Sequence, residues 1–484
     1  MQTAPFPTLR LVNVSLGRNP CMGTSLSSRG VTKRFLVNFL FAFFALNMSL
    51  TANTFSAENN KWVTTWTASA QGPYPSGNPS AQPNQSFTFP NPLEGARNQS
   101  FRMIVKPDVW GTRTRIRLTN SLGTQPVTFD HVYVGLQLSS AELFQGSNQT
   151  VTFNLEKSIV LQPGQWIWSD PIELPYAKNR NLKEVDNSFL EGRKMAVSFH
   201  VVGSSGPMTW HAKALTSSYV SLPDSGAVSG EESEQAFPFS TASWFFLDAV
   251  DMMLPASTKV ILNFGDSITD GTASTMNTDD RWPDVLSRRI HRQFGRSVVV
   301  LNAGIGGNQI AGPQDYSPLK PFTGGPSSFM RLERDVLSLS SVNLVVWLEG
   351  INDFSKNGNA SVTQVISKLE EGVKRLNAAG IKVMGATVGS ALNSSSAAHG
   401  SQEQDIKRRS LNDFILSSPI FESVVDFDRI TLDPQSGEMK AELVPDSTTG
   451  GPGDKLHPNR VGYQRMGYSV DLRAIAKILH LPYQ

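Results

Sequence analysis

The sequence predicts two domains, a β-sandwich followed by an α/β domain built on a parallel sheet. Its 484 residues are too many for one ordinary hydrophobic core. Short strand-like runs separated by turn residues fill the stretch from Lys61 to Pro255. After Pro255, strands alternate with amphipathic helices, which is typical of βαβ units and a parallel sheet. We expect a leader over residues 1–57, the sandwich over 58–255 and the α/β domain over 256–484.

The leader has the layout of a secretory signal. Three basic residues between Arg29 and Arg34 precede a stretch of sixteen mostly apolar residues, 35–50, and small and polar residues follow. A membrane span needs about 20 mainly apolar residues, so this stretch is short for one. We therefore expect export to the periplasm or the extracellular space, with no membrane segment in the mature form. An uncleaved N-terminal anchor is the alternative.

The composition fits a folded protein rather than a disordered chain. Apolar residues make up 39 % of the sequence, charged residues 17 %, and the formal net charge is +2. Lys and Arg form no run, so we expect no nucleic-acid partner. The single cysteine, Cys21, excludes an intramolecular disulfide and a cysteine zinc cluster. Seven histidines leave a His-rich metal site open, although no HExxH motif occurs.

Strands dominate the first predicted domain. Thr112 to Leu118 alternates with period two, which places its three arginines on one face. Further strands are expected at Val132–Leu136, Thr150–Phe153 and Met195–Phe199. Many short strands with Gly, Pro and Asn turns are typical of a sandwich or jelly roll. We expect the Pro- and Ser-rich loop from Gln71 to Pro92 to be exposed.

Two side-chain groups in this domain have alternative interpretations. Trp166 and Trp168 lie on one side of a strand, where they either pack between sheets or form a platform for sugar rings. Arg113, Arg115 and Arg117 form either a solvated sheet face or a grip for an anionic polymer. We favour the core for the tryptophans and solvent for the arginines.

The second domain is expected to consist of alternating strands and helices. The strands are predicted at Lys259–Phe264, Ser297–Asn302, Val342–Leu348 and Lys382–Val388. Pro283 suits the first turn of a helix that runs to Gln293, because its missing N–H has no partner there. A second helix is expected from Ser361 to Ala379, where apolar residues recur at helical spacing until Gly380.

Four segments carry unusual polar residues, three of them directly after predicted strands and the last near the C-terminus. They are Gly265-Asp266-Ser267, Asn302 to Asn308, Gly350-Ile351-Asn352-Asp353 and Asp454 to Asn459. Ligands of α/β sheets bind beyond the carboxyl ends of the strands. We therefore expect these segments to meet at one edge of the sheet.

The residue types in these segments match the needs of a nucleophilic serine. A hydroxyl such as that of Ser267 needs an adjacent base, and His457 is the candidate. Asp454 can hold the imidazole in one tautomer. The backbone N–H of Gly307 and the amide of Asn352 can bind an oxyanion.

In order, the blocks GDSITDG, NAGIGGN, GIND and DKLHPN resemble those of the SGNH/GDSL hydrolases. Flanking phrases resemble the secreted esterase branch that carries an N-terminal β domain. The resemblance covers about Lys259 to Gln484. It implies a three-layer α/β/α fold with Ser267 as nucleophile, His457 as base and Asp454 as its orienting partner. It also implies that Gly307 and Asn352 are oxyanion donors.

The resemblance implies a carboxylic ester hydrolase that acts through an acyl-enzyme and needs no metal or organic cofactor. Small-molecule or polysaccharide esters are the expected substrates, with acetylated carbohydrate first. A non-catalytic carbohydrate- or surface-binding protein on the same scaffold, or an acyltransferase, is the alternative. The loop between Asp446 and Asp454 is longer than is usual in that branch, and Gly389-Ser390 stands where a proline is usual.

Simpler roles remain for single residues. Ser267 could only cap a helix, Asn352 could only form a turn, and Gly307 could only permit a tight bend. His399 lies in a loop of small residues, and we expect it to lie outside the site.

Overall fold

The computed structural model describes residues 59–178 and 185–483 of the chain. The signal segment predicted at 1–57 lies outside the described residues, so export stays a prediction. Among the described residues, no helix is both long enough and apolar enough to cross a membrane. Residues 56–484 group together as one unit, and the domain boundary expected at residue 256 stays a prediction.

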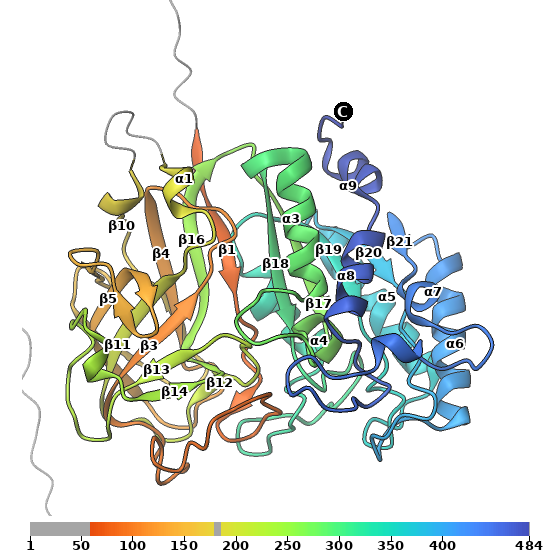
Figure 1. Ribbon diagram of the computed structural model, residues 1–484, viewed down its shortest axis with the longest axis horizontal. Coiled ribbons are helices and arrows are strands. Elements are labelled where there is room, and N and C mark those ends of the chain that lie inside the picture. Colours follow the sequence, from red (N-terminus) through yellow and green to blue (C-terminus); the bar gives the residue numbers. More distant parts are fainter. Residues whose placement is uncertain (1–58, 179–184, 484) are drawn as a thin grey trace, which may run out of the picture. The chain divides into compact units, whose positions relative to one another are not determined.

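A five-stranded parallel sheet organises the C-terminal half of the chain (Figure 1). Its strands, in sheet order, are β18 (Val298–Gly304), β17 (Lys259–Gly265), β19 (Val342–Leu348), β20 (Lys382–Ala386) and β21 (Ser423–Val425). Neighbouring strands pair in parallel register throughout. These apolar runs alternate between two cores, since Ile261 packs on one side of the sheet and Val260 and Leu262 on the other. The predicted parallel sheet is confirmed.

Helices cover both faces of this sheet. On one side lie α3 (Trp282–Phe294), α7 (Phe427–Thr431), α8 (Arg460–Ser469) and α9 (Leu472–Leu479). On the other side lie α4 (Ser328–Leu332), α5 (Val362–Ala378) and α6 (Gln402–Ser417). Helix α5 begins with a capping box between Ser361 and Gln364, which explains why its apolar stripe starts where the sequence predicts. Figure 1 shows α3 and α8 lying across the sheet face that is turned to the viewer.

Antiparallel sheets fill the N-terminal region. The first contains β1 (Asn60–Thr67), β16 (Leu247–Pro255), β4 (Arg113–Thr119), β9 (Trp166–Trp168) and β10 (Ile172–Glu173). The second contains β14 (Phe239–Thr241), β13 (Ser218–Val220), β3 (Arg97–Val105), β11 (Met195–Ser204), β5 (Val127–Ser139), β6 (Glu142–Leu143), β7 (Gln149–Thr150) and β8 (Ser158–Leu161). The third contains β15 (Trp244–Phe245), β12 (Thr209–His211) and β2 (Gly72–Pro73).

Short helical turns join these elements. They are η1 (Pro175–Ala177), α1 (Asn187–Leu190), η2 (Glu234–Ala236), η3 (Gly295–Ser297), the π-helical turn η4 (Glu333–Leu337) and η5 (Ala441–Leu443).

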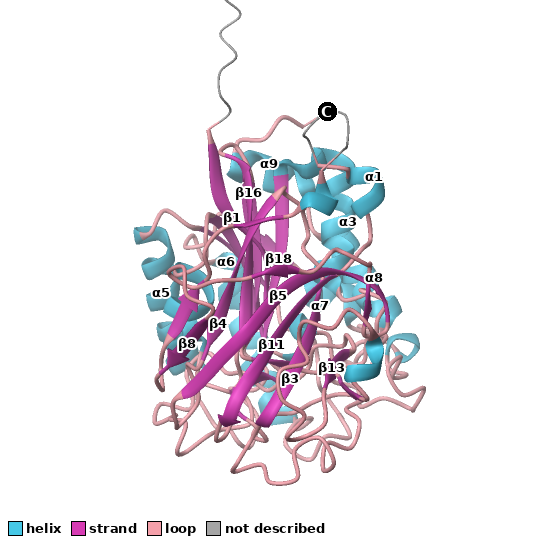
Figure 2. Ribbon diagram, turned by 90° about the vertical axis from the view of Figure 1, so that its left-hand side faces the viewer, coloured by secondary structure: helices cyan, strands magenta, loops and turns pink. Residues whose placement is uncertain are grey.

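Aromatic side chains fill the core shared by the first two sheets. Strands β3, β11 and β5 run side by side (Figure 2). Phe101 of β3 stacks on Phe199 of β11 at 5.4 Å, and the ring of Phe246 meets Phe101 edge-on. Val63 of β1 and Ile116 of β4 belong to the same buried cluster. The β-rich character of this region is confirmed, whereas the jelly-roll topology stays a prediction.

The arginine face of β4 is solvated at Arg113 but buried at Arg117. Arg117 is 1 % exposed and pairs with Asp248 at 2.6 Å. Arg115 pairs with Asp251 at 2.8 Å. The expectation of a solvent-facing row is wrong at Arg117, because the neighbouring strand β16 supplies buried carboxylates that no local pattern reveals.

The two tryptophans of β9 stack on these arginines. Trp166 lies 5.0 Å from the guanidinium of Arg117, and Trp168 lies 4.5 Å from that of Arg115. Trp168 packs against the core as expected, but Trp166 is 41 % exposed and does not.

Candidate active site

Ser267 lies at the carboxyl end of β17, at the start of the short helix α2 (Ser267–Asp270). Asp266 caps this helix, since its Oδ1 accepts a hydrogen bond from the N–H of Ile268 at 2.9 Å. The capping role considered for Ser267 therefore belongs to its neighbour. As the first helical residue, Ser267 has a backbone N–H without a partner in the helix. Its hydroxyl is left to make contacts outside the helix.

His457 provides that contact. Its Nε2 lies 2.7 Å from the Ser267 hydroxyl, and its Nδ1 lies 2.6 Å from Oδ2 of Asp454. The other oxygen of Asp454 accepts the backbone N–H groups of Leu456 and His457, each at 2.9 Å. Lys455 takes the left-handed conformation (φ +58°) that closes this turn. Helix α8 then starts at once, with Asn459 as its cap.

These contacts keep Asp454 ionised. Burial raises the pKa of its carboxyl, but the hydrogen bond from the His457 ring and the backbone N–H groups outweigh burial. The net result is a pKa well below the ordinary value. An ionised Asp454 fixes the proton of His457 on Nδ1, which leaves Nε2 free to accept the proton of Ser267.

Gly307 lies in the loop after β18 with φ +81°, a conformation that L side chains rarely adopt. A Cβ there would lie 3.2 Å from Nδ2 of Asn78, so the loop also leaves little room for one. Within the described residues, the backbone N–H of Gly307 donates to no protein group. It is available to an oxyanion, in addition to permitting a tight bend.

Asn352 follows β19 and lies beside this loop. One hydrogen of its Nδ2 is donated to the carbonyl of Asn308 at 3.0 Å, which leaves the second hydrogen available. The neighbouring Gly306 donates its N–H to Asp270 of α2 at 3.0 Å. The five predicted residues are thus gathered at the carboxyl edge of the parallel sheet. Their catalytic roles stay predictions.

His399 contradicts the expectation that it lies outside the site. Its Nε2 lies 3.2 Å from Oδ1 of Asn352, and its Nδ1 lies 3.1 Å from the hydroxyl of Ser396. Burial, together with the nearby His457, lowers the pKa of His399 to about 4. A neutral ring that donates from Nε2 orients the Asn352 amide so that its NH₂ faces the loop of Gly307. No sequence motif marks this residue, because it reaches the site from a loop of small residues.

We expect His399→Ala to lower kcat for p-nitrophenyl acetate about 10- to 100-fold with little change in KM, because the oxyanion donor loses its orientation. His399→Gln, whose amide can still donate, should restore most of the rate. Initial-rate kinetics on the native protein, His399→Ala and His399→Gln would give the kcat and KM values to compare. An equal loss in both variants, or a change confined to KM, would contradict the orienting role. The native kcat should show no titration of His399 above pH 5, because its pKa is about 4.

The N-terminal region supports the oxyanion loop directly. Gln71 Nε2 donates to the carbonyl of Gly306 at 2.9 Å and to Oδ1 of Asn78 at 2.7 Å. Gln71 is fully buried, and the exposed loop expected from Gln71 to Pro92 is wrong at residues 71–74 and at Phe89, which are buried. Sequence reasoning missed this contact, because the two segments are 235 residues apart.

His211 of β12 acts on the same loop through Asp270. Its Nε2 lies 3.1 Å from Oδ1 of Asp270, whose other oxygen accepts the N–H of Gly306. Burial lowers the pKa of His211, but the Asp270 carboxylate and hydrogen bonds outweigh burial and raise it overall. His211 thus holds the Asp270 carboxylate in place beneath the loop.

Arg331 of α4 joins the strand ends. Its guanidinium donates to the carbonyls of Gly265 at 2.9 Å and of Ala303 at 2.8 Å. It also donates to Oδ1 of Asn308 at 2.7 Å and pairs with Asp335. One buried cation therefore fixes the ends of β17 and β18, from which Ser267 and the oxyanion loop emerge.

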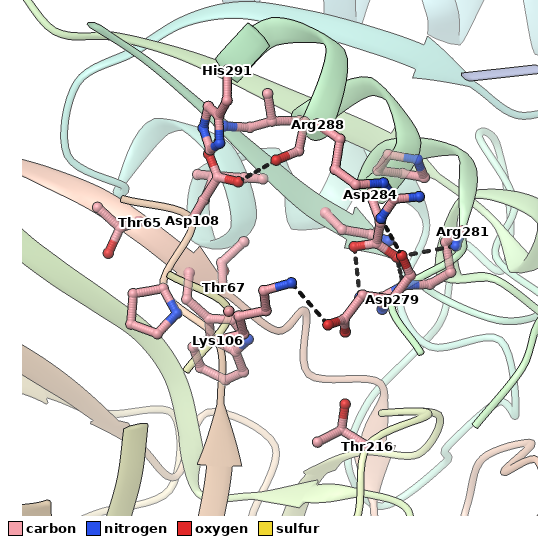
Figure 3. A pocket seen from close by; sticks show the side chains of 18 of the residues that line it. Thr65, Thr67, Lys106, Asp108, Thr216, Asp279, Arg281, Asp284, Arg288 and His291 are labelled. Atoms are coloured by element: carbon pink, nitrogen blue, oxygen red, sulfur yellow. Dashed lines mark hydrogen bonds and ion pairs between the residues drawn. The ribbon is translucent and has the colours of Figure 1, made fainter. Parts of the chain in front are cut away.

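A cavity of about 500 Å³ lies between the N-terminal sheets and α3 (Figure 3). Some of its charged side chains form ion pairs, with Lys106 at 2.9 Å from Asp279 and Arg281 at 2.7 Å from Asp284. His291 lies 3.0 Å from Asp108. Of these contacts, the one between His291 and Asp108 joins α3 to the segment that follows β3.

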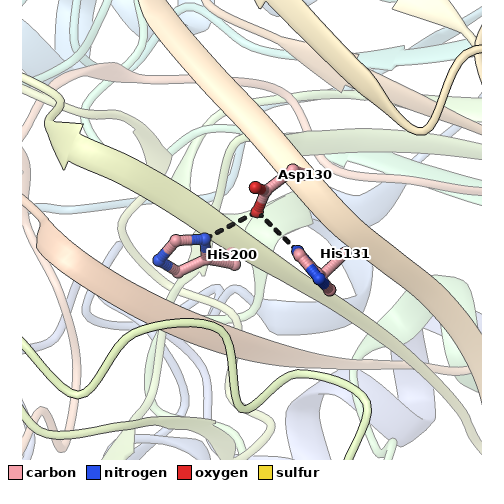
Figure 4. A group of neighbouring side chains, drawn as sticks. All are labelled: Asp130, His131 and His200. Atoms are coloured by element: carbon pink, nitrogen blue, oxygen red, sulfur yellow. Dashed lines mark hydrogen bonds and ion pairs between the residues drawn. The ribbon is translucent and has the colours of Figure 1, made fainter.

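Among the described residues, one cluster has the composition of a metal site: Asp130, His131 and His200 (Figure 4). Oδ1 of Asp130 lies 2.6 Å from Nδ1 of His200, whose Nε2 lies 2.9 Å from Oδ1 of Asn98. Burial raises the pKa of Asp130, but the two imidazoles outweigh burial and lower it. Because both nitrogens of His200 already face oxygens, hydrogen bonding accounts for the cluster.

Comparisons with known proteins cover part of the chain. Residues 264–465 match the model of the GDSL-like Lipase/Acylhydrolase family. No curated protein matches the chain. A solved carbohydrate acetylesterase family member from Sinorhizobium meliloti is 17 % identical, with 46 % of this chain and 100 % of that chain covered and a TM-score of 0.35. A lipase/acylhydrolase from Enterococcus faecalis is 22 % identical, with 47 % and 98 % covered and a TM-score of 0.34.

Proposed function

We propose that this chain, whose residues 264–465 belong to the GDSL-like lipase/acylhydrolase family, hydrolyses carboxylic esters through an acyl-enzyme on Ser267. The family match confirms the predicted SGNH/GDSL superfamily and the enzyme class, a carboxylic ester hydrolase. One observation carries the assignment of the nucleophile. Ser267, His457 and Asp454 form a continuous hydrogen-bonded series with distances of 2.7 and 2.6 Å.

In the first half-reaction, the Ser267 oxygen attacks the acyl carbonyl while its proton passes to Nε2 of His457. The carbonyl oxygen becomes an oxyanion, which the N–H groups of Ser267 and Gly307 and the NH₂ of Asn352 bind. When the tetrahedral intermediate collapses, the C–O bond to the alcohol breaks. His457 returns its proton to the leaving alcohol, and the acyl group stays on Ser267.

In the second half-reaction, water replaces the alcohol. His457 accepts a proton from the water as its oxygen attacks the acyl carbon. Collapse of the second intermediate breaks the bond to Ser267, whose oxygen takes the proton back from His457, and the free acid leaves. Asp454 stays ionised throughout and stabilises the imidazolium that forms twice in the cycle.

Small acyl groups on carbohydrate are the proposed substrates, and the protein is proposed to act after export. Tight packing around the oxyanion loop supports a small acyl group. A Cβ on Gly306 would lie 2.5 Å from Oδ1 of Asn78, so the oxyanion loop packs closely against the N-terminal region. The basic and apolar leader in residues 1–57 supports export.

Trapping the acyl-enzyme tests the proposal. We expect a p-nitrophenyl ester, quenched in acid during steady turnover, to leave the acyl group on the peptide that contains Ser267, as read by mass spectrometry. A panel of acetyl, butyryl and octanoyl esters should give kcat/KM values that fall with chain length. An acyl group on another residue, or no covalent species together with undiminished turnover, would contradict the mechanism. Rising kcat/KM with chain length would contradict the small-acyl preference.

A further inference from the structure

A groove of about 590 Å³ lies at the same edge of the sheet as Ser267, between the loop after β18 and the start of α5. Its wall at Gln309 and Ala311 follows the oxyanion loop directly in the chain. Gln309 directly follows Asn308, the acceptor of the Asn352 amide. The N–H groups of Ile310 and Ala311 both donate to the carboxylate of Asp353 at 2.8 Å. A ligand in this groove would therefore extend from an ester held at the oxyanion donors.

The groove is lined by uncharged polar side chains. They include Gln309, Gln314, Asn357, Asn359, Thr363 and Ser367. Within the described residues, none of these six side chains makes a hydrogen bond to another protein group. Gln309 is only 4 % exposed, yet its amide has no protein partner. The amide of Gln309 is not sealed from solvent, so water or a ligand in the groove can pair with it.

The charges and polar groups that line the groove indicate which class of ligand it can bind. Lys368 is the only ionisable residue among those that line the groove, and it is paired with Glu371 at 2.8 Å and lies 4.4 Å from the Phe329 ring. The groove thus offers no free cation to an anionic ligand. Its row of amides and hydroxyls does not suit a long acyl chain. The half-buried ring of Phe322 adds one apolar face.

We propose that this groove binds neutral sugar residues next to the one that carries the scissile ester. Amides and hydroxyls pair with sugar hydroxyls as donors and acceptors, and an aromatic ring packs against the apolar face of a sugar. The choice of an ester as the reacting group rests on the proposed function. The groove indicates which alcohol the ester contains. We infer a neutral oligosaccharide rather than an acidic oligosaccharide or a lipid.

Binding to a protein that cannot turn over separates this inference from the esterase mechanism. We expect Ser267→Ala to bind xylotriose saturably in a calorimetric titration, and trigalacturonate at least tenfold more weakly. Adding Asn357→Ala and Thr363→Ala should weaken xylotriose binding at least fivefold, because both side chains are exposed and serve only the groove. Adding Asn377→Ala, an exposed amide of α5 outside the groove, should leave the Kd unchanged. Equal binding of the two trisaccharides, no binding of xylotriose, or equal Kd values in the groove and control variants would overturn the inference.

Turnover by the otherwise native chain gives a second readout. The ratio of kcat/KM for O-acetylated xylotriose to that for p-nitrophenyl acetate should fall at least fivefold in the Asn357→Ala, Thr363→Ala variant. A parallel fall for both esters would indicate damage to the catalytic edge and overturn the assignment of the groove. If the native chain hydrolyses neither ester, the proposed function fails, while the binding titration still decides whether the groove holds sugar.

Discussion

Replacing Ser267 with alanine should lower kcat for p-nitrophenyl acetate by at least about 10⁴-fold. The variant keeps the oxyanion donors and His457 but has no oxygen to carry the acyl group. What activity remains comes from water oriented by the same donors, which is why we expect a residual rate above that of buffer. Initial rates at saturating substrate, corrected for the uncatalysed reaction, would measure the loss.

Ser410→Ala is the matched control, because this serine is exposed on α6 and bonds only to the carbonyl of Ile406. Both variants should keep the native circular dichroism spectrum and thermal midpoint. A Ser267→Ala protein that turns over the ester at the native rate would remove the serine mechanism and favour a scaffold without catalysis at this edge.

Replacing Asp454 with asparagine should lower kcat by about 10⁴-fold. In the native chain, Oδ2 of Asp454 accepts a hydrogen bond from Nδ1–H of His457 at 2.6 Å. Oδ1 accepts hydrogen bonds from two backbone N–H groups. Asparagine would keep its oxygen on the two backbone donors and present its NH₂ to Nδ1. The imidazole would then carry its proton on Nε2 and could no longer accept the proton of Ser267.

The matched control is Asp413→Asn, a change of the same kind on the exposed side of α6. We expect native kinetics from that variant. The KM of Asp454→Asn should change far less than its kcat, since Asp454 contacts the base rather than the substrate. A loss below about tenfold would mean that Asp454 does not set the tautomer of His457.

Local sequence patterns suffice for the α/β half of the fold. Strand β19 has the predicted bounds of Val342–Leu348, and the helices α3 and α5 end within one residue of prediction. A short apolar run predicts a buried strand, and apolar residues at helical spacing predict a helix with one buried face. Both patterns are local and do not depend on distant contacts. The N-terminal sheets were harder to predict, because short strands pair over long separations. Thr150–Phe153, for example, forms only the two-residue strand β7 and an isolated bridge.

The sequence by itself determined the parallel sheet, the family and the identity of Ser267, His457 and Asp454 as candidates. Each of these depends on residue types at fixed local spacing, such as the three-residue step from Asp454 to His457 that one turn can close. Only the tertiary structure decided what surrounds them. Gln71 reaches Gly306 across 235 residues, and His399 orients Asn352 across 47. Such contacts depend on where distant segments meet when the core packs, and no local periodicity encodes that position.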